Sequence, residues 1–289
     1  VALAGCTASD PTTAPSPSAS ASAETIIIGS QAFSENEIVA EIYAQALETA
    51  GYSVERKFNI GSREVYIPAI ESGEVSLIPE YTGNLLQYFD TAATAKSASD
   101  IYAALPALLT PVGLSVLDQS VASDEDSYNV TKAFSDANNV TSLSDLSALT
   151  IPLTVGGNSE LETRPYGPAG LLSVYGVTVA FTSIEDYGGP LTVKALNDGV
   201  VQLADLYTSD PAIEKNGFVT LTDPEHLMVA NNVVALINTT SFPADAAGVI
   251  NAVNAKLTTA GLVHINTESA TGDSPATIAA KWLKDNLIG

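Results

Sequence analysis

The sequence predicts an α/β protein made of two units, and three observations support this fold class. Short β-branched runs alternate with amphipathic segments that end at glycine, as in parallel strands joined by right-handed crossover helices. The alternation restarts after Ser123. Two long strand-like runs, 112–121 and 227–237, flank the middle unit, and we interpret them as crossovers between lobes. Lobe 1 then comprises 25–121 with 230–289, and lobe 2 comprises 122–229.

Local patterns place the elements of lobe 1. Ser34 and Glu37 have the spacing of a capping box that opens a helix, and Gly51 ends that helix. One long helix is expected from Pro243 to Ala260, with Gly261 as its stop. The remaining expected strands are 25–29, 54–59 and 75–78, and the remaining expected helices are 62–72, 82–89, 99–109 and 275–287.

Lobe 2 shows the same alternation. Pro190 stands where a helix begins, a position at which its missing N–H has no cost. The expected strands are 127–130, 151–155, 177–181 and 200–206, and the expected helices are 143–149, 168–175 and 190–198.

Charge narrows the classes of partner. The 289 residues include 33 acidic and 11 basic side chains, a formal net charge of -22, which would repel nucleic acid and anionic lipid headgroups. A cationic small ligand would be attracted. The same acidic surface also serves solubility, and that interpretation stays open. With 46% hydrophobic residues the chain can form real cores, and no apolar run reaches the length of a membrane span.

The N-terminal segment has the layout of an anchored domain. Small residues precede the single cysteine, Cys6, a pattern similar to the bacterial lipoprotein cleavage site. Residues 1–5 would then be a signal-peptide remnant, and 6–24 a lipidated cysteine with an Ala/Ser/Thr/Pro tether. We expect an extracytoplasmic domain that the membrane holds by lipid alone. A free cysteine near a frayed terminus is the alternative.

The sequence contains few of the residue patterns that catalysis requires. His226 and His264 lack neighbouring carboxylates at metal-binding spacing. The GxSxG, GxGxxG and P-loop motifs do not occur. We therefore expect no enzyme, no cofactor and no metal site.

Recognition residues instead gather where strands end, and in open α/β sheets ligands bind outside the carboxyl ends of strands. Tyrosine faces attract cations, at roughly 0.5 to 2 kcal/mol for each contact. Arg164 could bind a carboxylate through two parallel hydrogen bonds from its guanidinium group, and an inter-loop ion pair is the alternative. Each tyrosine could equally be a rim or core aromatic. The candidate residues are Gln31, Tyr81, Asn84, Tyr128, Arg164, Tyr207 and Thr208.

Four segments, in order, resemble the osmoprotectant-binding proteins of ABC importers. They are IIIGSQAFSENEIVAEIYAQALETAGYSVERKF, GSREVYIPAIESGEVSLIPEYTGNLL, GGNSELETRPYGPAGLLSVYGV and DYGGPLTVKALNDGVVQLADLYTSDPAI. The resemblance implies a type II periplasmic-binding-protein fold with a cleft between two lobes. It also implies a quaternary ammonium ligand such as choline, glycine betaine or carnitine, delivered to a membrane permease by a monomer.

The resemblance also implies site residues. The family's cage tyrosines fall on Tyr81, Tyr128 and Tyr207, and its carboxylate-binding arginine falls on Arg164. Gln31 stands where many members have lysine, which favours choline or a larger ligand over glycine betaine. Asn231 stands where a fourth ring is expected, so the cage would be open on one side.

Other functions remain open on the sequence. Within the binding class, an amino acid or a larger betaine-bearing metabolite is the rival ligand. An enzyme or a sensor on the same fold is the rival from another class.

Overall fold

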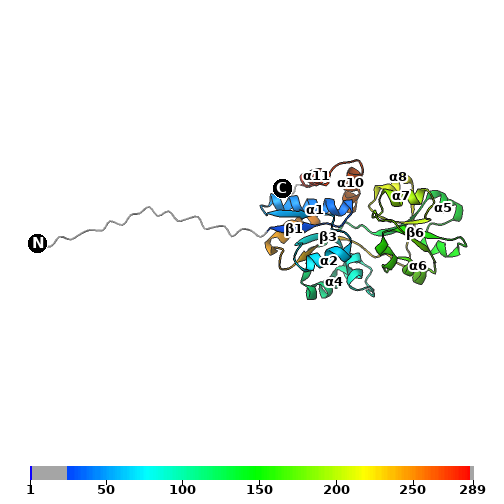
Figure 1. Cartoon of the computed structure of the whole chain (residues 1–289), viewed down its shortest axis with the longest axis horizontal. Coiled ribbons are helices and arrows are strands. Elements are labelled where there is room, and N and C mark those ends of the chain that lie inside the picture. The colour runs from blue at the N-terminus through cyan, green and yellow to red at the C-terminus, as the bar shows by residue number, and fades with distance from the viewer. Residues whose placement is uncertain (2–24, 287–289) are drawn as a thin grey trace.

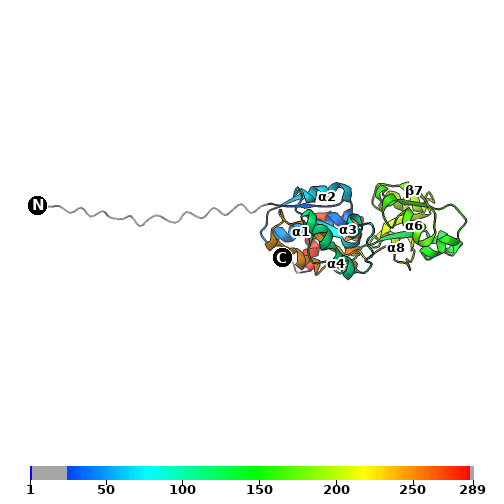
Figure 2. The same cartoon turned by 90° about the horizontal axis from the view of Figure 1, so that it is seen from below.

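The computed structural model describes Val1 and residues 25–286. It shows two lobes side by side, each with a five-stranded sheet between helices (Figure 1). The same separation is seen from below in Figure 2. The α/β prediction is confirmed. Cys6 and the expected tether lie outside the described residues.

Lobe 1 takes its strands from both ends of the described chain. Its sheet order is β2-β1-β3-β10-β4, in which β10 is antiparallel to both of its neighbours. Its elements are β1 (Ile26–Gly29), α1 (Ser34–Thr49), β2 (Val54–Lys57), α2 (Arg63–Glu71), β3 (Leu77–Tyr81), α3 (Thr82–Phe89), α4 (Ala98–Leu109), η1 (Thr110–Val112), β4 (Leu114–Val116), β10 (Val233–Asn238), η4 (Ala244–Ala246), α9 (Ala247–Asn254), α10 (Thr259–Ala270) and α11 (Pro275–Asp285).

Lobe 2 is formed by the middle of the chain. Its sheet order is β7-β6-β8-β5-β9, with β5 antiparallel to both of its neighbours. Its elements are β5 (Asp126–Val130), α5 (Lys132–Asn138), η2 (Leu143–Ala148), β6 (Thr154–Gly157), η3 (Ser159–Thr163), α6 (Pro168–Tyr175), β7 (Ala180–Ser183), α7 (Pro190–Asn197), β8 (Leu203–Tyr207), α8 (Pro211–Asn216) and β9 (Val219–Thr220).

Alternating strand residues bury both faces of each sheet. In β3, Leu77 and Tyr81 join the core beneath α1, α9, α10 and α11, whereas Ile78 joins the core beneath α2, α3 and α4. In β8, Leu203 packs on the side of α6, and Leu206 packs on the side of α7. This alternation follows from the two-residue period of a strand. It also directs Glu80 and Tyr81 to opposite faces of the first sheet.

Two crossover segments, 117–125 and 221–232, connect the lobes side by side. Val233 N donates to the Ala122 carbonyl at 2.9 Å, and Ser123 forms an antiparallel bridge with Asn232. The prediction of long strands here is wrong in length, because β4 ends at Val116 and β10 begins at Val233. The Asn232 Nδ2 donates to the Ser120 carbonyl at 3.0 Å, so side-chain bonds add to an irregular set of backbone bonds between the crossovers.

Two helix boundaries also differ from expectation. Ser34 forms no capping box, since its hydroxyl pairs with that of Ser269 at 2.6 Å and the N-cap position is Phe33. The expected long helix over 243–260 is broken into η4, α9 and α10. Gly261 lies within the first turn of α10, where its N–H donates to the Thr258 hydroxyl at 3.0 Å. The Thr258 side chain therefore caps the beginning of α10, and Gly261 does not end a helix.

None of the helices found between residues 25 and 286 is sufficiently long and apolar to cross a membrane.

Candidate ligand-binding site

A cavity lies between the lobes, at the ends of strands from both sheets. About 420 Å³ of space lies between its walls, and this volume includes open solvent. Parallel strands end at one edge of a sheet, and loops that follow β1, β3, β6, β7 and β8 all reach this cavity. The lining residues are Gln31, Ser62, Arg63 and Asn84 from lobe 1, with Asp126, Asn158, Glu160, Leu161, Arg164, Tyr166, Tyr187, Asp205 and Tyr207 from lobe 2.

Two Asp-X-Tyr patterns form the lobe 2 wall. The antiparallel register of β5 and β8 sets Asp126 opposite Tyr207 and Tyr128 opposite Asp205. Residues directly opposite each other share one face of a sheet. Of these four side chains, Asp126, Asp205 and Tyr207 line the cavity.

Tyr128 lies deeper, in the core of lobe 2. Its side chain is only 1% exposed, and its hydroxyl donates to the Tyr166 carbonyl at 2.8 Å. Its ring therefore packs behind Tyr166, which does line the cavity. The structure thus places Tyr128 behind the cavity wall, and a strand covered on both faces gives no sequence signal for which tyrosine meets the cleft.

The acidic pair of this wall is incompletely satisfied. Asp126 accepts a hydrogen bond from Asn84 Nδ2 of lobe 1 at 2.7 Å. Asp205 Oδ1 is buried and has no hydrogen-bond partner among the described residues. Burial, with the neighbouring negative charge of Asp126, raises the pKa of Asp205 well above its usual value. A cation placed beside this carboxyl would favour its ionised form.

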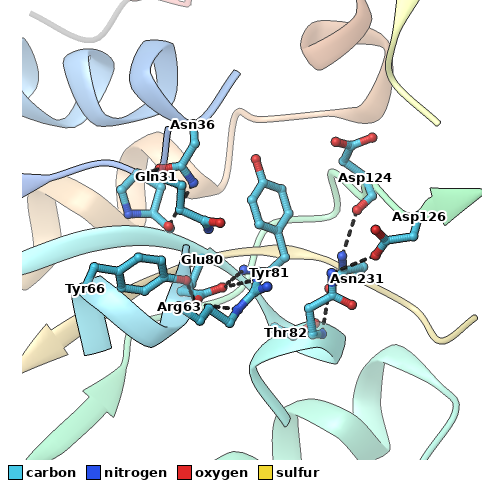
Figure 3. Close-up of polar contacts among 12 residues, drawn as sticks. Gln31, Asn36, Arg63, Tyr66, Glu80, Tyr81, Thr82, Asp124, Asp126 and Asn231 are labelled. Atoms are coloured by element: carbon cyan, nitrogen blue, oxygen red, sulfur yellow. Dashed lines mark hydrogen bonds and ion pairs between the residues drawn. The ribbon is translucent and has the colours of Figure 1, made fainter. Parts of the chain in front are cut away.

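In the lobe 1 wall, by contrast, the charge of Arg63 is paired within the lobe. Arg63 lines the cavity, and its Nε and Nη2 donate to the two oxygens of Glu80 at 3.0 and 2.8 Å. The Tyr66 hydroxyl and the Tyr81 backbone N–H also donate to that carboxylate (Figure 3). A buried charge pair with these additional bonds is well compensated, so Arg63 brings little net charge to the cavity.

Tyr81 lies in the wall but behind its surface. Its ring points away from the Arg63–Glu80 pair (Figure 3), and it is 4% exposed and not among the lining residues. Its hydroxyl donates to Glu35 Oε1 at 2.8 Å. Burial raises the pKa of both Glu35 and Tyr81. Glu35 also accepts from the Ser209 hydroxyl of lobe 2 at 2.6 Å, so this group joins the lobes.

Phe33 connects the rings of the two lobes. Its ring centroid lies 5.3 Å from that of Tyr207, 5.9 Å from Tyr81 and 6.0 Å from Tyr187. These are contact distances for aromatic pairs. Among the described rings, Phe33 thus connects Tyr81 with the lobe 2 tyrosines by aromatic contacts.

Arg164 is held by an ion pair across the cleft. Its Nη1 lies 3.0 Å from Glu64 Oε1 of α2 in lobe 1. Although burial acts in the opposite direction, bonds from Ser62 and Arg164 lower the pKa of Glu64. Of the two interpretations that the sequence left open, the structure shows the inter-loop ion pair. The guanidinium lines the cavity, but its charge already has a partner.

The other predicted residues have separate environments. Gln31 lines the cavity, and its Nε2 is buried without a hydrogen-bond partner in the described part of the chain. Thr208 Oγ1 accepts from Glu125 N at 2.9 Å at the edge of a crossover. Asn231 is 3% exposed and binds Asn84 N and the Asp124 carbonyl at 3.0 and 2.9 Å. Thr208 and Asn231 are therefore hinge residues outside the cavity lining.

Close backbone contact fixes the position of Asn231. A Cβ at Gly83 would lie 2.4 Å from the Ala230 carbonyl, so only glycine lets α3 approach the crossover this closely. The side chain of position 231 is turned into that junction, as Figure 3 shows beside Asp124. An open side of the cage at this position is consequently not observed.

Nine of the thirteen lining residues were not predicted from the sequence, among them Asp126, Asp205, Tyr166 and Tyr187. Asp126 and Asp205 precede the predicted tyrosines by two residues, and this period-two spacing was an available signal. Tyr166 and Tyr187 lie in the quoted segments TRPYGP and DYGGPLTV, in loops after strands β6 and β7. Their approach to one cavity depends on loop conformation, for which the sequence carried no periodic signal.

Comparisons with known proteins place these features in a family. The chain is 27% identical over 217 residues to the glycine betaine-binding protein YehZ of Escherichia coli K12, covering 70% of each chain. Among solved structures, a glycine betaine/carnitine/choline ABC transporter protein has a TM-score of 0.72 at 20% identity, with 91% of this chain and 99% of that chain covered.

Lactococcal OpuAC, solved closed with glycine betaine, has a TM-score of 0.65 at 13% identity, with 91% and 96% covered. These likenesses show the type II periplasmic-binding-protein fold, which confirms the predicted architecture. They are transport proteins and not enzymes, in line with the expected function. Residues 24–285 match the substrate-binding domain of ABC-type glycine betaine transport systems, and the chain therefore belongs to that family.

Proposed function

We propose that this chain captures a quaternary ammonium compound between its lobes and delivers it to an ABC permease. The observation that carries the proposal is the lobe 2 wall, where tyrosine rings lie beside carboxyls that form no ion pair within the described chain. A quaternary ammonium has no N–H to donate, and aromatic faces and negative charge are what bind it. The wall comprises Tyr166, Tyr187, Tyr207, Asp126 and Asp205.

The charge of the cavity supports a ligand with positive charge. Both lining arginines, Arg63 and Arg164, are paired with glutamates. The lining acids Asp126, Asp205 and Glu160 form no ion pair within the described chain. The named relatives fit this class, because one is a glycine betaine-binding protein and another was solved with glycine betaine.

Closure of the lobes is the working step in this proposal. Asn84 with Asp126, and Glu64 with Arg164, already bridge the cleft around the cavity. A ligand that touches both walls stabilises the closed state by its differential affinity for that state, and only this difference drives closure.

We place the protein outside the cytoplasm as a monomer held by lipid on Cys6. The cysteine context and the Ala/Ser/Thr/Pro segment support this placement. Labelling of cells with a fatty-acid analogue should tag the wild type and leave Cys6→Ser unlabelled. Equal labelling of both would contradict the anchor at this residue.

Calorimetric titration with choline, glycine betaine and carnitine tests the ligand class. The wild type should bind at least one of them, and Tyr207→Ala should weaken that binding about 2- to 30-fold, the equivalent of one cation–π contact. The structurally remote Tyr102→Phe, which loses only a bond to the Leu117 carbonyl, is the control. Absence of binding in the wild type would contradict the proposed class.

A further inference from the structure

We infer that Tyr187 is a ligand-contacting ring that serves as the fourth ring of the cage, which the family pattern suggested at position 231. The inference rests on the proposed function and names a binding residue beyond it. Three features of Tyr187 carry it: its backbone conformation, its place on the cavity wall, and its contact with the opposite lobe.

The backbone at Tyr187 is in the left-handed region. Within the described chain four non-glycine residues have positive φ, and three of them are asparagine or histidine, which adopt this region comparatively readily. Tyr187, with φ 52°, is the exception. A bulky residue in this conformation costs free energy, and such residues cluster at ligand clamps.

The surrounding loop holds this conformation in place. The Tyr187 N–H donates to Asn158 Oδ1 at 2.7 Å, and Asn158 also lines the cavity. Next to it, Asp186 accepts from Leu191 N and from the Thr192 hydroxyl, both at 2.6 Å. These bonds tie the loop to the N-terminal turn of α7. The backbone conformation of the loop is thereby held before a ligand arrives.

The ring itself faces both the cavity and lobe 1. Tyr187 is half-buried and lines the cavity together with Tyr207. Phe33 of lobe 1 stacks on it with an interplanar angle of 28° and also lies against Tyr207. Because Phe33 and Tyr187 belong to different lobes, this stack exists only when the lobes are in contact. The ring would therefore bind the ammonium group and would stack on Phe33 only in the closed state.

Position 231 does not supply the fourth ring of the cage. Both ends of the Asn231 amide are used at the hinge, by Asn84 N and by the Asp124 carbonyl. A ring there would have to leave that junction to reach the cavity. Tyr187 reaches the cavity from lobe 2 without any such change.

Titration of Tyr187 variants with choline, glycine betaine and tetramethylammonium tests the inference. Tyr187→Leu, which keeps apolar bulk without a ring, should weaken binding about 2- to 30-fold, and Tyr187→Phe should lose less. Tyr187→Gly should also weaken binding, while its Tm stays at or above that of the wild type because strain is relieved. Opposite directions for affinity and stability separate a binding role from a structural one.

Asn139→Gly provides the matched control, since it makes the same backbone change at φ 55° in the C-cap of α5, outside the cavity lining. It should leave affinity unchanged. If the wild type binds and Tyr187→Leu and Tyr187→Gly bind equally well, the inference is overturned while the proposed function stands. If the wild type binds none of the three compounds, both are overturned.

Discussion

The two walls of the cleft differ in how far their charged groups are paired. In the lobe 1 wall, Arg63 has both oxygens of Glu80, and the Tyr81 hydroxyl has Glu35. In the lobe 2 wall, Asp205 Oδ1 is buried without a described partner, and three tyrosines line the cavity. A buried polar group without a partner is costly, and a ligand that completes it recovers part of that cost.

This difference separates two tasks within one cleft. Lobe 2 presents the charge and the rings that would recognise a cation. Lobe 1 presents a surface whose charged side chains are already paired, and this surface closes over the ligand. Phe33, Asn84 and Glu64 of lobe 1 contact lobe 2. The following changes test this division.

The largest expected effect is on stability, in the lobe 1 wall. Glu80→Gln leaves Arg63 buried without its carboxylate, which should cost about 3 to 5 kcal/mol of unfolding free energy. Denaturant unfolding measures it. Glu74→Gln, which breaks the exposed pair with Lys57, should change little. A small effect at Glu80 would mean that this wall is less rigid than its bonds indicate.

Next comes the carboxyl of the lobe 2 wall. Asp205→Asn should weaken binding of a cationic ligand at least about 10-fold, because the variant lacks the negative charge that attracts the cation. The raised pKa of Asp205 adds a pH effect. Wild-type affinity for a cation should rise as pH rises through that raised pKa, because the cation requires the ionised form, whereas the variant should show no such rise.

In the ligand-free protein, the carboxyl of Asp205 should make stability fall as pH rises, whereas it makes ligand affinity rise. A pKa that is higher in the folded state means that the folded chain holds the proton more tightly. Stability should therefore be complete below the usual aspartate pKa and fall as pH rises through the raised value. Thermal unfolding across pH measures this slope. An equal slope in Asp205→Asn would assign it to other groups.

A smaller effect is expected behind the wall. Tyr128→Phe removes the bond to the Tyr166 carbonyl and should cost about 1 kcal/mol of stability. Its ring remains, so affinity should change less than in Tyr207→Ala. If Tyr128→Ala reduced affinity as strongly as Tyr207→Ala without loss of stability, Tyr128 would be a cage ring after all.

The smallest effect is expected at the ion pair across the cleft. Glu64 is half exposed, so its pair with Arg164 should contribute less than about 1 kcal/mol. Arg164→Gln and Glu64→Gln should weaken choline and glycine betaine binding slightly and to the same extent. Selective loss of glycine betaine in Arg164→Gln would instead show that the arginine binds the ligand carboxylate.

Much of the architecture could be predicted from the sequence. Strand and helix alternation gave the α/β class, and strand ends gave the location of Gln31, Asn84, Arg164 and Tyr207 on the cavity. The crossovers could not be predicted in detail, because side-chain bonds from residues such as Asn232 replace a regular ladder there. Tyr128 and Tyr81 were indistinguishable from cage residues, since both faces of their strands are covered and alternation alone does not show which face meets the cleft.

A crystal structure with a bound trimethylammonium compound tests the central claim most directly. The ammonium nitrogen should lie within about 6 Å of the ring centroids of Tyr187 and Tyr207, on the side of Asp205. A nitrogen enclosed by Tyr81 and Tyr128, with Tyr187 turned away, would contradict the assignment of recognition to the lobe 2 wall.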